Sequence, residues 1–74
     1  APLNLSALEA LIQKSGTATF DIAALVAAGV SRASDKIKVL GKGKLASKVT
    51  LQVHAASASA KAAIEALGGS IELV

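Results

Sequence analysis

Two glycines stand among lysines in the segment VLGKGKLASKV, residues 39–49, at the end of a strand-like run. Glycine turns with nearby lysines bind phosphate in many nucleotide-binding proteins, because backbone amides can approach the anion closely. The Walker pattern requires four residues between its glycines, followed by lysine and then serine or threonine. Here a single residue separates Gly41 from Gly43. The next lysine, Lys44, is followed by Leu45, so the Walker pattern is not matched.

The relaxed dinucleotide-binding fingerprint is matched more closely, by Gly41, Gly43 and Ala46. That fingerprint requires a helix to begin at the turn, so that the first amides of the helix meet the pyrophosphate. The residues that follow, VTLQV at 49–53, alternate instead with the period of a strand. The sequence therefore favours glycines that form a bend between two strands over a nucleotide site.

Residues suited to catalysis or metal binding are scarce. His54 is the only histidine, and although a triad with Ser57 and Asp35 can be written, no nucleophile elbow surrounds the serine. A histidine at the end of a strand is more often a surface or capping residue, which is what we expect of His54. One histidine, no cysteine and scattered carboxylates do not make a zinc site, and Glu65 and Glu72 are expected on the solvated surface. The sequence predicts no enzyme activity, no metal and no cofactor.

Basic side chains are concentrated in the middle of the chain. Residues 31–54 contain six of the eight lysines and arginines and a single acid, which gives this segment a net charge of +5 in a chain of +3. Such a focused basic patch indicates a polyanionic partner, either nucleic acid or an anionic membrane surface. The predicted RNA-binding residues are Arg32, Lys36, Lys38, Lys42, Lys44 and Lys48.

These cations also have a simpler explanation. Lysines on a strand face and in a turn keep a small apolar domain soluble and prevent edge-to-edge pairing of sheets. The chain contains one aromatic residue, Phe20, whereas proteins that bind single strands stack bases on several aromatic side chains. If nucleic acid is the partner, we therefore expect contacts mainly to phosphate and sugar.

The 74 residues are expected to form one small domain, with two short helices first. A capping box formed by Ser6 and Glu9 predicts a first helix, which ends at Gly16. Asp21 is a good N-cap for a second helix, which ends at Gly29 in a left-handed conformation.

From residue 37 the hydrophobic period changes from helical to two, with alternate aliphatic residues expected to face the core. The predicted strands are residues 37–40, 49–53 and 70–74. A third helix begins at Ser57 or Ser59 and ends at Gly68 and Gly69. Strand, helix and strand at this spacing form a right-handed βαβ unit with parallel strands. The predicted class is mixed α/β, with short N-terminal helices followed by strand, turn, strand, helix and strand.

The ordered set of elements resembles the C-terminal domain of bacterial large-subunit ribosomal protein fifteen. The stretches that carry the resemblance are KVLGKGKL (38–45), VTLQV (49–53) and AASASAKAAIEALGGSIELV (55–74). The family has a Lys–aliphatic–Leu–Gly–x–Gly–x–Leu turn, an alternating strand, a Ser–x–x–Ala helix start and a double-glycine stop. LVAAGV (25–30) and NLSALEAL (4–11) are similar to its two opening helices. One departure is the pair Ala55 and Ala56, where the family often has an aromatic or bulkier residue.

The resemblance implies a non-catalytic structural constituent of the large ribosomal subunit, which acts on the ribosome in the cytoplasm. The implied partners are large-subunit ribosomal RNA and neighbouring large-subunit proteins, with no membrane and no small-molecule substrate. Residues 1–74 are expected to be a single globular domain, the C-terminal portion of a longer protein with a basic N-terminal arm. The alternative is a small protein-interaction domain that docks through its alanine-rich helices.

Overall fold

Consecutive strands of this chain alternate between two parallel sheets. The computed structural model describes residues 2–32 and 34–74. Within them the elements are β1 (Pro2–Asn4), α1 (Leu5–Ser15), β2 (Thr19–Phe20), α2 (Ile22–Ala27), β3 (Lys38–Leu40), β4 (Thr50–Val53), β5 (Ala55–Ala56), α3 (Ala58–Ala66) and β6 (Ser70–Leu73). One sheet has the order β1-β3-β5 and the other the order β2-β4-β6, with parallel neighbours throughout. The predicted mixed α/β class is confirmed.

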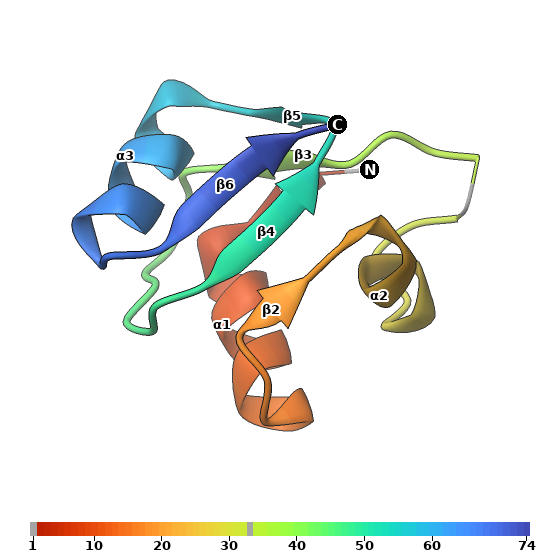
Figure 1. The fold of residues 1–74 in the computed structure, drawn as a ribbon, viewed down its shortest axis with the longest axis horizontal. Helices are drawn as coiled ribbons and strands as arrows, with labels where there is room; N and C mark the ends of the chain where they lie inside the picture. The colour runs from red at the N-terminus through yellow and green to blue at the C-terminus, as the bar shows by residue number, and fades with distance from the viewer. Residues whose placement is uncertain (1, 33) are drawn as a thin grey trace.

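The alternation makes the chain wind around a common core, adding one strand to each sheet per turn. Parallel strands cannot be joined by a tight turn, so helices and long loops form the connections. Figure 1 shows β2, β4 and β6 across the front of the view, with β3 and β5 at the top and α1 behind. In the same view α3 lies beside β6, and α2 lies beyond the end of β2.

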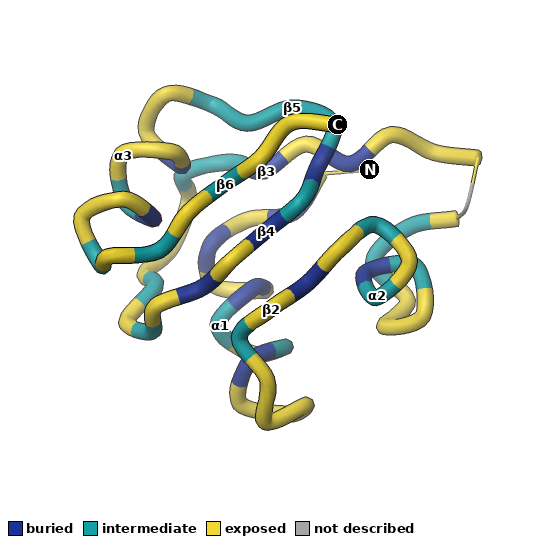
Figure 2. The backbone as a smooth tube through the Cα atoms, in the orientation of Figure 1, coloured by how far each residue is buried: buried dark blue, intermediate teal, exposed yellow. Residues whose placement is uncertain are grey.

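The core is built from the alternating residues of the two central strands, as their period predicts. Ile37 and Val39 at β3, and Val49, Leu51 and Val53 along β4, are each at most 1% exposed. Burial of one such side chain contributes about 1.5–3 kcal/mol to folding. Figure 2 shows buried positions alternating with less buried ones along both strands, whereas the loops are mostly exposed.

Helix α1 begins differently from the prediction. Its N-cap is Asn4, whose side-chain Oδ1 accepts a hydrogen bond of 2.8 Å from the amide of Ala7. The predicted capping box of Ser6 and Glu9 is therefore wrong, and the Glu9 carboxylate forms its hydrogen bonds elsewhere. Asparagine and serine cap helices about equally well, and β1 delivers Asn4 in the extended conformation that an N-cap requires.

The remaining helix ends follow the sequence prediction. Asp21 caps α2 through a 2.7 Å hydrogen bond from an amide of the first turn. Gly29 then adopts a φ of +82°, and the amide of Val30 reaches back to the carbonyl of Leu25 at 3.1 Å. Of the two candidate caps for α3, Ser57 is the one whose hydroxyl accepts a first-turn amide.

Two features of the topology differ from the sequence-based expectation. The strands β1, β2 and β5 contain only two or three residues each, too few to show a period in the sequence. The glycines lie between two strands as predicted, but β3 and β4 belong to different sheets, so residues 41–49 join the two sheets. The predicted βαβ unit is present as the parallel pair β4 and β6, joined through β5 and α3.

Candidate nucleic-acid interface

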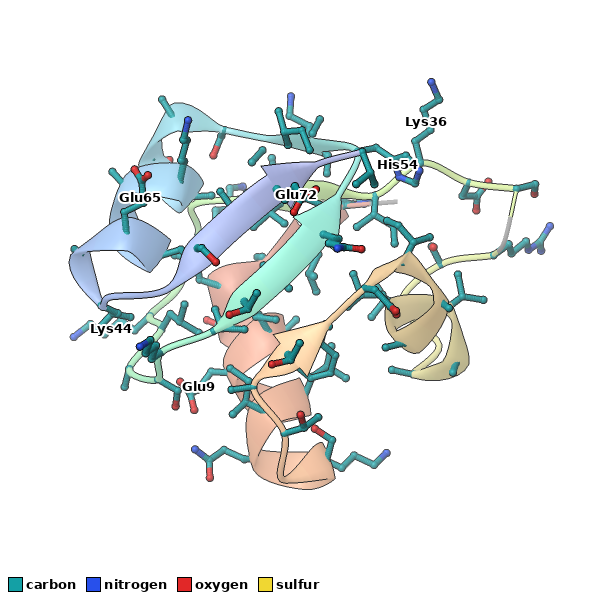
Figure 3. All side chains as sticks on the ribbon, in the orientation of Figure 1. Glu9, Lys36, Lys44, His54, Glu65 and Glu72 are labelled. Carbon is teal, nitrogen blue, oxygen red and sulfur yellow. The ribbon has the colours of Figure 1, made fainter. Side chains whose placement is uncertain are left out.

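The six predicted RNA-binding residues are all exposed, and they fall before, at the start of and after β3. Those that precede or begin β3 form the first basic set: Arg32, Lys36 and Lys38. Those that follow β3 form the second basic set: Lys42, Lys44 and Lys48. Figure 3 labels one member of each set, Lys36 and Lys44, at opposite ends of the molecule. The basic segment is therefore continuous in sequence, but Lys36 and Lys44 lie on distant parts of the surface.

The second basic set lies on residues 41–48, here named the basic loop, whose glycines allow close contact with two helices. A Cβ atom at Gly41 would overlap the side chain of Ser59 near the start of α3. A Cβ atom at Gly43 would overlap Ser6 near the start of α1, and Gly43 also has a left-handed φ of +84°. The glycines therefore dock the basic loop onto α1 and α3.

Several amides at these helix starts are already used within the chain. The amide of Leu5 donates to the carbonyl of Lys42 at 2.8 Å, and the side chains of Asn4 and Ser57 accept first-turn amides of α1 and α3. Residues 43–49 are irregular and lead into β4, so no helix begins at the glycine turn in this described part of the chain. This excludes the dinucleotide-binding arrangement, which requires the first amides of a helix at that point.

Glu9 of α1 binds the second half of the basic loop. Its Oε1 accepts hydrogen bonds from the amides of Ala46 at 2.9 Å and Ser47 at 3.1 Å. Its Oε2 accepts one from the Ser47 hydroxyl at 3.0 Å and one from the side-chain amide of Gln13 at 2.7 Å. These hydrogen bonds, above all that from Gln13, lower the pKa of Glu9 and keep its carboxylate ionised at neutral pH.

His54 binds backbone rather than a catalytic partner. The half-buried ring accepts a 2.9 Å hydrogen bond at Nδ1 from the amide of Ile37, which fastens the entry to β3. The Ser57 hydroxyl accepts the amide of Ala60 at the start of α3. The histidine and the serine of the hypothetical triad therefore serve two different elements of the fold.

The described part of the chain contains neither a cluster of metal ligands nor a helix that could span a membrane. Within 2–32 and 34–74, no three His, Cys, Asp or Glu side chains are grouped so that they could hold a metal ion. No helix in this part of the chain has the length and apolarity needed to cross a membrane.

Comparison with known proteins matches the chain to ribosomal proteins. The family described as "Ribosomal proteins 50S-L15, 50S-L18e, 60S-L27A" matches residues 2–72. The large ribosomal subunit protein uL15 of Rhizorhabdus wittichii is 49% identical over 78 residues, covering 100% of this chain and 45% of that protein. The uL15 protein of Agathobacter rectalis is 46% identical, covering 99% of this chain and 49% of its own length. That of Methylacidiphilum infernorum is 47% identical, covering 100% and 47%.

These matches confirm the resemblance seen in the sequence. The chain spans about half the length of the curated relatives it matches. The family match begins in β1 and ends in β6, and so includes every element described above. The chain therefore belongs to the 50S-L15, 50S-L18e and 60S-L27A family of ribosomal proteins.

Proposed function

We propose that this chain is a non-catalytic structural constituent of the large ribosomal subunit, which binds large-subunit ribosomal RNA and supports subunit assembly. The relatives carry the name of large ribosomal subunit proteins, which supports a site of action on the ribosome in the cytoplasm. The proposed partners are ribosomal RNA and neighbouring large-subunit proteins, without a cofactor, a membrane or a small-molecule substrate.

The observation that carries the proposal is the exposure of every residue of both basic sets in a member of this family. Exposed lysine and arginine bind nucleic-acid phosphates and release counterions, so affinity falls as salt rises. Phe20, the one aromatic residue, is 4% exposed and cannot stack on a base. We therefore assign phosphate contacts to Arg32, Lys36, Lys38, Lys42, Lys44 and Lys48.

The separation of the two basic sets favours contact with two stretches of RNA backbone. The domain measures 30 × 25 × 18 Å, and Lys36 and Lys44 lie at opposite ends of it. Exposed charges separated by more than a Debye length, about 8 Å at physiological salt, act nearly independently. The losses of binding free energy on neutralising each set should therefore add.

Filter binding to large-subunit ribosomal RNA across a salt series tests the proposal. Changing Lys42 and Lys44 to glutamine should lower the magnitude of the slope of log K against log salt by about 1.4–1.8, because two phosphate contacts are lost. The matched control changes Lys14 and Lys61 to glutamine. These lysines are exposed but lie outside both sets, so the control should leave the slope unchanged. A flat salt response by the unchanged chain, or equal losses in the two variants, contradicts the proposal.

A second candidate function is the docking of a protein partner on the alanine-rich helices. One observation favours it, an apolar surface hollow of about 330 Å³ between α1 and the end of α2, bordered by Leu11 and Val30. The large hydrophobic residues that the described chain exposes, Leu73 and Val74, lie elsewhere, at the end of β6. Reversing the charge of the second basic set separates the two functions. Docking predicts normal incorporation into large subunits, whereas RNA binding predicts a loss.

A further inference from the structure

Glu9 is an acid held in the middle of a basic surface. The two residues whose amides it binds, Ala46 and Ser47, lie between Lys44 and Lys48 of the second basic set. Figure 3 shows Glu9 and Lys44 at the same end of the molecule. We propose that Glu9 is the positioning residue of the basic loop. It holds the loop in one conformation, so that the lysines are already ordered when they meet RNA phosphates. This inference rests on the proposed function.

The basic loop is held in both of its halves. In the first half, the carbonyl of Lys42 accepts the amide of Leu5 at 2.8 Å. In the second half, the Glu9 carboxylate accepts three hydrogen bonds of 2.9–3.1 Å, two of them from backbone amides. On either side of Glu9 in α1, Leu8 and Ile12 are 0% and 9% exposed and pack in the core. The carboxylate is therefore anchored to the core, and it anchors the loop in turn.

The second half of the loop depends strongly on this one side chain. Among the described residues, the hydrogen bonds that tie the backbone of 43–48 to the rest of the chain are those to Glu9. Leu45 adds a partly buried apolar contact with the core. Removing the carboxylate should therefore leave the fold in place but allow residues 46–48 to sample several conformations, and ordering them on binding would then weaken affinity.

Charge and positioning predict opposite effects when Glu9 is removed. As a negative charge beside lysines, Glu9 repels RNA phosphates, so its removal should strengthen binding if charge were its only influence. As the positioning residue it improves binding, so its removal should weaken binding even though the net charge becomes more positive. The sign of the change in affinity therefore distinguishes a positioning residue from an incidental surface acid.

The experiment compares Glu9→Ala with Glu65→Ala in the 74-residue chain, by filter binding to large-subunit ribosomal RNA. Glu65 is an exposed helical acid, labelled on α3 in Figure 3, with no hydrogen bond to the basic loop among the described residues. We expect Glu9→Ala to weaken binding about three- to tenfold, the cost of ordering a few residues. Its salt slope should stay the same, because every lysine is retained. Glu65→Ala should bind equally well or more tightly.

Amide hydrogen exchange measured on the same samples reports positioning without RNA. In Glu9→Ala the amides of Ala46 and Ser47 should lose protection, whereas those of Leu51 and Val53 in β4 should keep it. If Glu9→Ala also proves unstable, Glu9→Gln replaces it, since its side-chain oxygen can still accept the two amides. The other side-chain atom becomes an NH2 group, which cannot accept the hydrogen bonds from Gln13 and from the Ser47 hydroxyl, so we still expect a loss of affinity, smaller than for Glu9→Ala.

Each outcome decides the inference. Unchanged or tighter RNA binding by both Glu9 variants, together with lost protection at Ala46 and Ser47, overturns the positioning role but leaves the proposed function standing. Retained protection of these amides in Glu9→Ala overturns it as well, because the loop would then be held by other groups. If the unchanged chain shows no salt-dependent RNA binding, the proposed function fails first and this inference fails with it.

Discussion

This chain needs glycine for two reasons, a left-handed backbone at some positions and a lack of room for a Cβ atom at others. Alanine substitutions of three glycines separate the two. Gly29 has a φ of +82° with open space where a Cβ atom would lie, so alanine there introduces backbone strain alone. Gly41 is not left-handed, and a Cβ atom there would overlap the side chain of Ser59. Gly43 combines a φ of +84° with an overlap with Ser6. The three variants therefore isolate strain, overlap and their sum.

The expected magnitudes follow from these geometries. A left-handed conformation costs an alanine about 1–2 kcal/mol, and overpacking costs about 1–3 kcal/mol. We expect the free energy of unfolding to fall by about 1–2 kcal/mol for Gly29→Ala, about 1–3 kcal/mol for Gly41→Ala and about 2–5 kcal/mol for Gly43→Ala. Relaxation at Gly43 is restricted, because the backbone nitrogen of Ser6 lies 2.9 Å from the position of the added Cβ atom and cannot rotate away.

Urea unfolding followed by circular dichroism measures these free energies, and a double-mutant cycle with Ser6→Gly identifies the overlap. Ser6→Gly should recover part of the cost of Gly43→Ala, because a Cβ atom at position 43 would overlap the Ser6 side chain. It should recover none of the cost of Gly29→Ala, because no atom lies near a Cβ atom at position 29. If Gly43→Ala is no more destabilising than Gly29→Ala, or if no coupling to Ser6 is measured, the basic loop does not pack on α1 as described.

Three further predictions concern single hydrogen-bonding groups. Because the pKa of Glu9 is lowered in the folded chain, its contribution to stability is complete above the ordinary value of 4.5 and is lost as pH falls through the lowered value. Urea unfolding against pH should show this loss in the unchanged chain and not in Glu9→Gln. His54→Ala leaves the buried amide of Ile37 without its acceptor, so it should lower the free energy of unfolding by about 1–3 kcal/mol and speed the hydrogen exchange of that amide. His54→Asn should retain most of the stability and most of the protection of the amide. Asn4→Ala should lower stability by about 0.5–2 kcal/mol in thermal unfolding and Ser6→Ala by much less, and the reverse order would favour the capping box after all.

The parts of the fold that the sequence predicts are those with repeated or paired local signals. Residues 49–53 alternate over five positions, and α2 has both a capping aspartate and a closing glycine. The strands β1, β2 and β5 lack such signals, because two or three residues form a strand only when a neighbour supplies the hydrogen bonds. Their partners β3 and β4 are distant in sequence, so these strands belong to the tertiary structure rather than to local preference.

The candidate site shows the same division between local and long-range information. Six basic residues in one segment are visible in the sequence, but the distance between Lys36 and Lys44 in space depends on the path of the chain through β3. The role of Glu9 depends on Ala46 and Ser47, which lie 37 and 38 residues away. Its local pattern with Ser6 predicted a capping box, in which the carboxylate would bind one backbone amide. The basic loop offers it two amides and a hydroxyl, and this larger set of donors explains why the local prediction was wrong.

The same contact explains why a segment so similar to a phosphate loop has a different use. In a phosphate loop, free backbone amides converge on the anion. Here the converging amides of Ala46 and Ser47 are occupied by an anion of the chain itself, the carboxylate of Glu9. With these two amides occupied, we expect the lysine side chains to make the main contacts to an external phosphate, and they recognise charge and position rather than the shape of a small ligand. Such a surface favours a long polyanion over a free nucleotide, because only a long polyanion can neutralise both basic sets at once.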